Sequence, residues 1–216
     1  MNEKNLVPTP PPKPAAKKHN FPTEIVELPS KGLLYPKDNP LSSGKVEMKY
    51  MTAREEDILT NQNYIKKGIV LDKLMSALIV SDCNYDDLIV GDKNAIMVAS
   101  RILGYGQDYS FEFEGEEVTV DLSEIEPKWI NEEHLVEPHT NEFSYILPHT
   151  NTPITFKILN NKNEKMIEAE VKGLKKINKQ SSAELSTRLK HMLLSVNGDS
   201  TTKAIREFVD NHFLAR

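Results

Sequence analysis

The histidines of this sequence are the first candidates for metal chemistry. His134 and His139 are five residues apart with Pro138 between them, and His149 follows in a stretch that contains two further prolines. A zinc-binding helix instead places two histidines four residues apart, next to a glutamate. We therefore expect no metal site in this part of the chain.

The single cysteine, Cys83, is the candidate for a nucleophilic thiol. Asp82, Asp86 and Asp87 lie near it in sequence, and their charge would raise the pKa of the thiol and make it less reactive. A structural role is therefore expected for Cys83. Pairs of adjacent carboxylates occur elsewhere, but none lies in an apolar setting that would shift a pKa in an identifiable way. The sequence predicts a non-enzymatic protein without a cofactor.

A run of lysines, Lys172, Lys175, Lys176 and Lys179, is the local feature most suited to nucleic acid. It lacks the interleaved aromatic side chains of a base-stacking surface. The net charge of −5 over 216 residues and a pI near 5.7 also argue against a protein that neutralises phosphates. A solvated helix end is the favoured interpretation, because cations suit a helix C-terminus. Nucleic-acid binding through Lys172–Lys179 is kept as the alternative function.

The segment 52–106 has the clearest helical pattern and organises the rest of the chain. Thr52 followed by Glu55 predicts a capping box at a helix start. Apolar residues in 70–79 are spaced to share one helical face. A third helix is predicted with Asp92 as its N-cap and Gly104 at its end. These three helices are expected to form a small core.

Strands are predicted on both sides of this core. Stretches 24–28 and 45–50 precede it, and a β-hairpin over 109–122 follows, connected by Gly115-Glu116-Glu117. Phe111 and Phe113 on one face are expected opposite Val118, Val120 and Leu122. Two further strands are predicted at 142–147 and 154–159.

Helices are predicted towards the C-terminus, at 164–172 and 182–196 and again after the Asn197-Gly198-Asp199 break. The fold class is therefore α+β, a small helical core with β-hairpins and a C-terminal helical segment. Residues 1–20 contain five prolines and scattered lysines, which predicts a disordered tail. Residues 21–122 and 123–216 are expected to form two folded segments.

Two groups of apolar residues are candidates for an interaction surface. Leu33, Leu34 and Tyr35 are bulky for a turn region, so they either anchor the loop to the core or contact a partner. Phe208 and Phe213 belong to an apolar stripe of the last predicted helix. That stripe docks either on its own domain, the favoured alternative, or on a neighbouring chain.

Four stretches of structural residues resemble a protein family: Leu28–Gly32 with Tyr35-Pro36, Met51–Asp57, Leu88–Lys93, and Leu103–Gly106 followed by a Tyr-x-Phe strand. The family is that of the baseplate hub subunits and hub-assembly proteins of contractile-tailed, T-even-type bacteriophages. The similarity extends over Leu28 to Leu122. Some family members carry cysteine pairs in the hairpin, which suggests a small zinc ribbon. This sequence has no cysteine there, so zinc is not implied.

The resemblance implies a phage tail protein that acts in assembly of the baseplate central hub through contacts with other hub proteins. It leaves open whether the chain is a permanent hub subunit or an assembly chaperone, and whether it also associates with itself. The sequence has no apolar run of the roughly 20 residues that a bilayer requires and no secretory signal. We expect it in the host cytoplasm during assembly, and in the virion if it is a permanent subunit.

Overall fold

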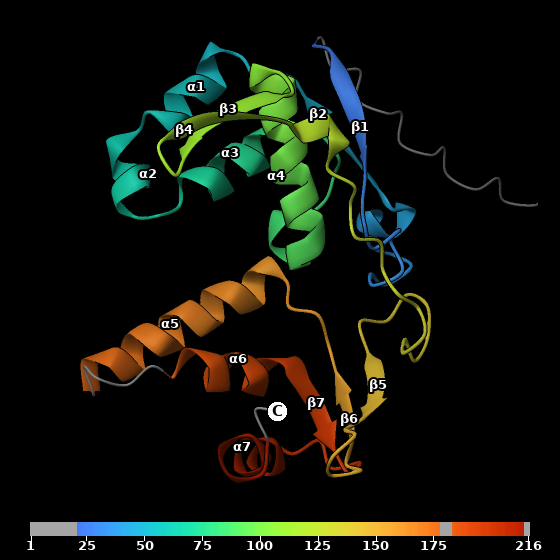
Figure 1. Ribbon diagram of the computed structural model, residues 1–216. Helices are drawn as coiled ribbons and strands as arrows, with labels where there is room; N and C mark the ends of the chain where they lie inside the picture. The colour runs from blue at the N-terminus through green and yellow to red at the C-terminus, as the bar shows by residue number, and fades with distance from the viewer. Residues whose placement is uncertain (1–20, 178–182, 214–216) are drawn as a thin grey trace, which may run out of the picture.

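The computed structural model describes residues 21–177 and 183–213 (Figure 1). The predicted tail, residues 1–20, and Lys179 lie outside the described residues. The strands are β1 Thr23–Glu27, β2 Lys45–Lys49, β3 Asp108–Phe113, β4 Glu116–Asp121, β5 Phe143–Ile146, β6 Pro153–Phe156 and β7 Leu193–Val196. The α-helices are α1 Ala53–Leu59, α2 Gln62–Lys66, α3 Val70–Leu78, α4 Val90–Tyr105, α5 Asn161–Ile177, α6 Glu184–Met192 and α7 Thr202–Asn211. Short 3-10 helices are η1 Pro40–Ser43, η2 Tyr85–Asp87 and η3 Leu122–Glu124.

Two lobes form the molecule, and the predicted α+β class is confirmed (Figure 1). In the N-terminal lobe, residues 21–122, β1 and β2 form an antiparallel pair and β3 and β4 form a hairpin. Its core combines apolar side chains of α3 and α4 with those of β2 and the loop after β1, among them Leu28, Met48, Met75 and Ile96. Each of these four is almost completely removed from water. The lobe is therefore held together by one contiguous apolar core.

The C-terminal lobe, residues 143–213, is built on the antiparallel sheet β5-β6-β7. Helix α7 packs Ile205, Phe208 and Val209 against Ile154 and Leu193 of this sheet. Helices α5 and α6 lie on the side that faces the N-terminal lobe (Figure 1).

The connection between the lobes, residues 125–142, runs along one side of the molecule (Figure 1). Ile130 and Leu135 from this connection and Phe143 of β5 pack on the core of the N-terminal lobe. The domain boundary predicted after Leu122 falls inside η3. Residues from both predicted segments therefore share one apolar core.

Several expected elements are present with the predicted chemistry. The backbone amide of Thr52 donates to the Glu55 carboxylate at 3.1 Å, and α1 begins at the next residue, which confirms the capping box. The hairpin pairs Phe111 with Val118 as predicted, whereas Phe113 pairs with Glu116 and not with an apolar residue. The predicted connection is wrong, because Glu116 and Glu117 belong to β4. The turn consists of Glu114 and Gly115, both with positive φ, as a type I′ turn requires.

The predicted ends of α4 are wrong. The helix begins at Val90 with Ile89 as N-cap, because the Asp92 carboxylate accepts from Ser30 and Tyr35 and not from the helix amides. It continues through Gly104 to Tyr105, and Gly106 is its C-cap with a positive φ of 83°. A Cβ on Gly104 would lie 2.9 Å from Cε of Met51, so the absence of a side chain serves close packing here.

Two predictions for the C-terminal lobe are also corrected. Helix α5 passes through Gly173, which was expected to end it, and continues to Ile177. Residues 193–196 form strand β7 instead of the end of a helix. Leu193 and Val196 pair with Phe156 and Ile154 of β6, and this tertiary pairing outweighs their helical spacing.

Candidate functional site

The predicted loop candidates mostly belong to the core. Leu34 and Tyr35 are 2% and 3% exposed, and Leu33 is half-buried. The Tyr35 hydroxyl donates to the Asp92 carboxylate at 2.6 Å and accepts from the backbone amide of Ile89 at 3.1 Å. Of the two alternatives for this loop, anchoring to the core or contact with a partner, the structure shows anchoring for Leu34 and Tyr35. Neither side chain offers an exposed surface to a partner.

The C-terminal stripe is likewise covered by its own lobe. Phe208 is buried, and Phe213 is half-buried and meets the Phe208 ring edge-on at 5.8 Å between ring centroids. Both pack on the cluster formed by α7 and the C-terminal sheet. This is the favoured alternative of the sequence analysis, and it leaves Phe208 inaccessible.

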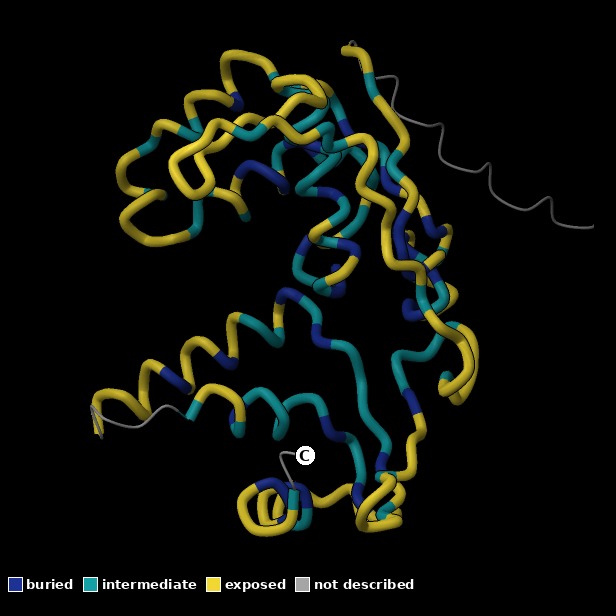
Figure 2. Tube along the Cα trace, in the orientation of Figure 1, coloured by how far each residue is buried: buried dark blue, intermediate teal, exposed yellow. Residues whose placement is uncertain are grey.

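An exposed aromatic surface lies instead on the β3–β4 hairpin, which Figure 2 shows as exposed over nearly its whole length. Tyr109, Phe111 and Phe113 alternate along β3 and so lie on the same face; they are 44%, 38% and 59% exposed. Val118 and Val120 lie opposite Phe111 and Tyr109 on β4. We call these five side chains the hairpin face. The sequence predicted its composition, but not that it faces solvent.

Arg101 joins the hairpin face to the end of α4. Its guanidinium carbon lies 5.2 Å from the centre of the Tyr105 ring and 5.5 Å from that of Tyr109. It also donates to the backbone oxygen of Gly106 at 2.9 Å. A guanidinium that stacks on two rings and bonds the backbone orients the start of the hairpin.

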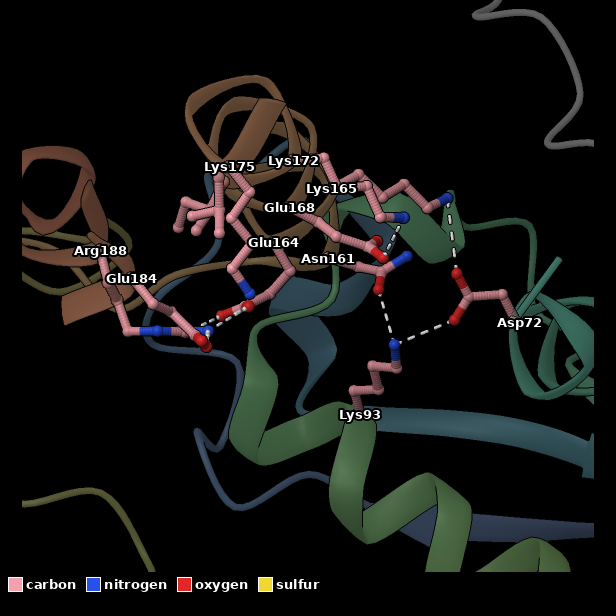
Figure 3. A pocket seen from close by; sticks show the side chains of 13 residues that line it. Asp72, Lys93, Asn161, Glu164, Lys165, Glu168, Lys172, Lys175, Glu184 and Arg188 are labelled. Atoms are coloured by element: carbon pink, nitrogen blue, oxygen red, sulfur yellow. Dashed lines mark hydrogen bonds and ion pairs between the residues drawn. The ribbon is translucent and has the colours of Figure 1, made fainter. Parts of the chain in front are cut away.

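A charged cleft of about 420 Å³ lies where α5 and α6 approach the N-terminal lobe (Figure 3). Its charges are largely paired. The two guanidinium nitrogens of Arg188 contact the two carboxylate oxygens of Glu164. Lys172 pairs with Glu168 on α5 at 2.6 Å. This alternation of opposite charges connects the two helices and leaves little net charge to attract a ligand of one sign.

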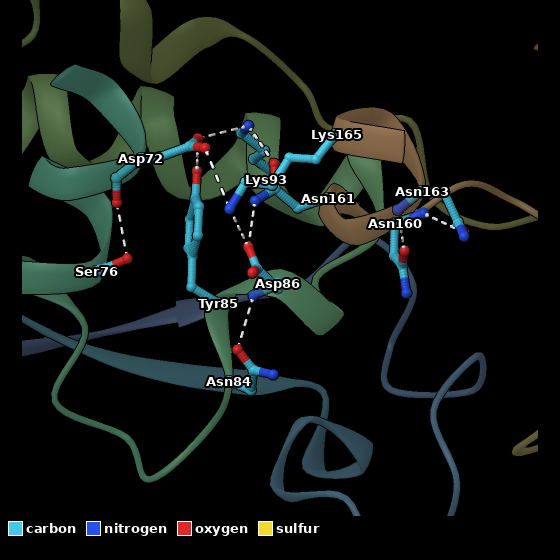
Figure 4. Close-up of polar contacts among 10 residues, drawn as sticks. All are labelled: Asp72, Ser76, Asn84, Tyr85, Asp86, Lys93, Asn160, Asn161, Asn163 and Lys165. Carbon is cyan, nitrogen blue, oxygen red and sulfur yellow. Dashed lines mark hydrogen bonds and ion pairs between the residues drawn. The ribbon is translucent and has the colours of Figure 1, made fainter. Parts of the chain in front are cut away.

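A polar network links the cleft to the N-terminal lobe (Figure 4). Lys93 donates to Asp72 at 2.9 Å and to the Asn161 side chain at 2.7 Å, and Asn161 donates to Asp86 at 2.7 Å. Lys165 completes the network with an ion pair to Asp86 at 2.6 Å. Burial opposes ionisation of both carboxyls, but hydrogen bonds from the lysines outweigh it and lower the pKa of Asp72 and of Asp86. The network holds α3, η2, α4 and α5 together.

Three lysines of the run, Lys172, Lys175 and Lys176, lie at the end of α5 next to this cleft. Lys172 is engaged by Glu168, whereas Lys175 and Lys176 occupy the last turn of the helix, where cations are favourable. Lys179 lies outside the described residues. The arrangement matches the solvated helix end that the sequence favoured.

The other chemical candidates have structural surroundings. Cys83 is half-buried, and burial followed by the charges of Asp82 and Asp87 raises the pKa of its thiol, as the sequence predicted in direction. His134 packs edge-on against Tyr145 with 5.2 Å between ring centroids. Within residues 21–177 and 183–213, no three His, Cys, Asp or Glu residues cluster as a metal ion would require.

Comparison with known protein families, with curated proteins and with solved structures found no match to this chain. Among the helices of the described residues, none combines the length and the apolar character needed to cross a membrane.

Proposed function

We propose that this chain is a non-enzymatic phage tail protein that acts in assembly of the baseplate central hub through protein–protein contacts. The observation that carries the proposal is the hairpin face, which presents three partly exposed aromatic rings on one side of an isolated hairpin. Further support comes from the resemblance of Leu28–Leu122 to the hub family.

The hairpin face is large enough to matter energetically. Each aromatic side chain has roughly 150–250 Å² to bury, and about half of this area is still exposed on Tyr109, Phe111 and Phe113. Covering it would contribute on the order of 7 kcal/mol before the costs of association, at about 25 cal/mol per Å². The partner we infer is a hub protein with an apolar surface that accepts the rings.

The alternative of nucleic-acid binding has weaker support. The lysines it would use border a cleft that also carries Asp72, Glu164, Glu168 and Glu184. A phosphate backbone would meet these carboxylates together with the cations, which reduces the electrostatic gain.

The test uses the double variant Phe111→Ser/Phe113→Ser in infected cells. We expect it to recover hub proteins, identified by mass spectrometry, at least tenfold less well than the unchanged chain. Leu185→Ser is the matched control, because it also replaces an exposed apolar side chain, on α6. Equal recovery of the same hub proteins by the double variant and by the control would refute a role for the hairpin face.

A second measurement distinguishes a hub subunit from an assembly chaperone. Mass spectrometry of purified mature particles and of assembly intermediates would find a permanent subunit in both samples. An assembly chaperone would be found only in the intermediates. Absence from both would contradict the proposal itself.

A further inference from the structure

An apolar groove of about 460 Å³ runs beside α4, next to β1. Ala95, Val98 and Ile102 of α4 line its floor. One wall is formed by the end of β1 and the loop after it, and the other by residues 122–127. We call this surface the α4 groove. Its lining is mainly aliphatic, and Ile125 on its wall is 50% exposed.

The α4 groove continues into a second hollow of about 240 Å³, because both share Pro29, Gly91 and Lys128 as lining residues. The second hollow reaches Trp129, the single tryptophan of the chain. The ammonium nitrogen of Lys31 lies 5.9 Å from the centre of the Trp129 ring. The continuous surface thus offers aliphatic side chains over most of its length and an aromatic ring at one end.

We propose that residues 1–20 of this same chain occupy the α4 groove. Their sequence includes Leu6, Val7 and five prolines between Pro8 and Pro14. Proline has an apolar ring and no amide hydrogen, so this segment cannot extend the β1–β2 ladder as a regular strand. It is suited to lie on an apolar groove, as proline-rich ligands do, at a low cost in conformational entropy.

Residues 1–20 join the described chain close to the α4 groove and are long enough to reach it. Phe21, where the described chain begins, is fixed beside β1, and Lys49 Nζ lies 5.3 Å from its ring centre. The groove begins near Val26, about 17 Å further along the strand at roughly 3.3 Å per residue. Residues 11–20 span about 30 Å in an extended polyproline conformation. Pro11 can therefore reach the groove if the residues after it run back along β1.

The carboxylates along the groove complement the lysines of residues 1–20, although the lining also includes the cation Lys128. Residues 1–20 contain four lysines and one glutamate. The rim of the groove carries the exposed carboxylates of Glu27 and Glu126, and Glu27 also pairs with Lys45 at 3.2 Å. Glu24 lies on the path along β1. Exposed pairs of this kind contribute little individually. They favour one orientation, while the proline rings supply the apolar contact.

This inference does not rest on the proposed function. It implies that the α4 groove is covered by the chain itself, so that any other ligand of the groove must first displace residues 1–20.

The experiment is disulfide trapping in the full chain, with Cys83→Ala to remove the native thiol. One variant combines Pro11→Cys with Ser123→Cys, an exposed position that lines the groove. The matched control combines Pro11→Cys with Ser76→Cys, an exposed serine on α3 outside the groove. Under a mild oxidant and at low protein concentration, we expect an intrachain disulfide at position 123 to form at least tenfold faster than at position 76. Adding Ile125→Glu should abolish this difference while the circular dichroism spectrum stays unchanged.

Equal rates at the two positions would overturn the proposal and leave the groove to a partner protein. A disulfide at position 123 that forms only between molecules, at a rate rising with concentration, would also overturn it, because the occupant would then be the segment of a second copy.

Discussion

Two carboxylates buried in the N-terminal lobe illustrate how single residues fix this fold. Asp92 is fully buried and accepts hydrogen bonds from the amide and hydroxyl of Ser30, at 2.9 and 2.6 Å, and from Tyr35. Glu55 is buried under Lys49, with 2.7 Å between Nζ and the carboxylate. A buried carboxylate is costly unless its partners are in place. Asp92 therefore joins segments that are far apart in sequence, whereas Glu55 fixes the start of α1 to the end of β2 just before it.

The pH dependence of stability should report Glu55 directly. Burial alone would raise the pKa of Glu55, but hydrogen bonds from Lys49 and Thr52 outweigh it and lower the pKa from 4.5 to about 2. The folded-state pKa is thus below the unfolded one, so the stabilisation is complete above pH 4.5 and is lost as the pH falls towards 2. It amounts to about 3 kcal/mol at neutral pH.

We therefore expect the stability difference between the unchanged chain and Glu55→Gln to shrink by about 2 kcal/mol from pH 6 to pH 3, measured by urea unfolding. Glu56→Gln, on the exposed side of the same helix, is the control and should show a much smaller change. A pH-independent difference for Glu55→Gln would contradict the assignment.

Glycine substitutions test the backbone of the loop after β1. Gly32 has a φ of 78°, and a Cβ there would lie 2.3 Å from the Ser42 carbonyl oxygen. We expect Gly32→Ala to lower the free energy of unfolding by about 3 kcal/mol or more, through strain and overlap together. Gly68→Ala has a similar φ of 67° and open space around it, so only strain of about 1 kcal/mol should remain. If Gly32→Ala and Gly68→Ala lower the free energy of unfolding equally, measured by thermal or urea unfolding, the loop around Gly32 must move enough to remove the overlap with Ser42.

Among the elements, the β3–β4 hairpin is the one that depends least on the rest of the lobe. Side chains on both of its faces are largely exposed, and its strands pair only with each other. A two-stranded hairpin is marginally stable by itself, so its turn and the Arg101 contacts must contribute much of its order. Its aromatic residues therefore remain available to a partner.

Straining the turn should loosen the hairpin without affecting α4. Gly115 has a φ of 85° and nothing within 4 Å of an added Cβ, so Gly115→Ala adds strain without overlap. We expect the ladder amides of β3 and β4 to exchange with deuterium about fivefold faster, as a loss of roughly 1 kcal/mol implies. Amides in the middle of α4 serve as the internal control. Equal acceleration there would mean that hairpin and helix open together.

In the whole molecule, Asn161 is the side chain that most directly joins the two lobes. It is 2% exposed and bonds Lys93 and Asp86 of the N-terminal lobe from the first position of α5. We expect Asn161→Ala to lower the free energy of unfolding by about 2 kcal/mol, because two charged partners lose a buried hydrogen bond. Asn163→Ala, two residues along α5, removes only the hydrogen bond that the Asn163 side chain accepts from the Asn160 amide, and it should cost clearly less. If Asn161→Ala and Asn163→Ala lower the free energy of unfolding by similar amounts in urea, the network around Asn161 does not couple the two lobes.

Local sequence patterns predicted the elements whose cause is local. The capping box at Thr52, the apolar face of α3 and the Phe111–Val118 pairing all depend on residues close in sequence. The predictions that were wrong concern residues whose decisive contacts are distant in sequence. Asp92 is held by Ser30, 62 positions earlier, and residues 193–196 become a strand because β6 lies beside them.

The candidate interaction surface was missed for a related reason. Alternation along β3 places Phe111 and Phe113 on one face, but it cannot reveal whether another element covers that face. Conversely, Phe208 has the spacing of a docking stripe and is covered by the C-terminal sheet. Solvent exposure follows from the tertiary arrangement, so it could not be predicted from spacing alone.

The two longest helices of the described residues, α4 and α5, begin side by side in the fold although they are far apart in sequence. Ile89 and Asn160 form an isolated antiparallel bridge, and α4 and α5 begin at the residues that follow them. Two backbone hydrogen bonds, from Val90 to Leu159 and from Asn161 to Leu88, fasten this point. The 17 residues of α5 extend about 25 Å from this point, so a small change of angle at the bridge would be amplified at the other end of the helix. A rotation of about 10° at the bridge would swing the distal end of α5 by roughly 4 Å, as the helical rise implies.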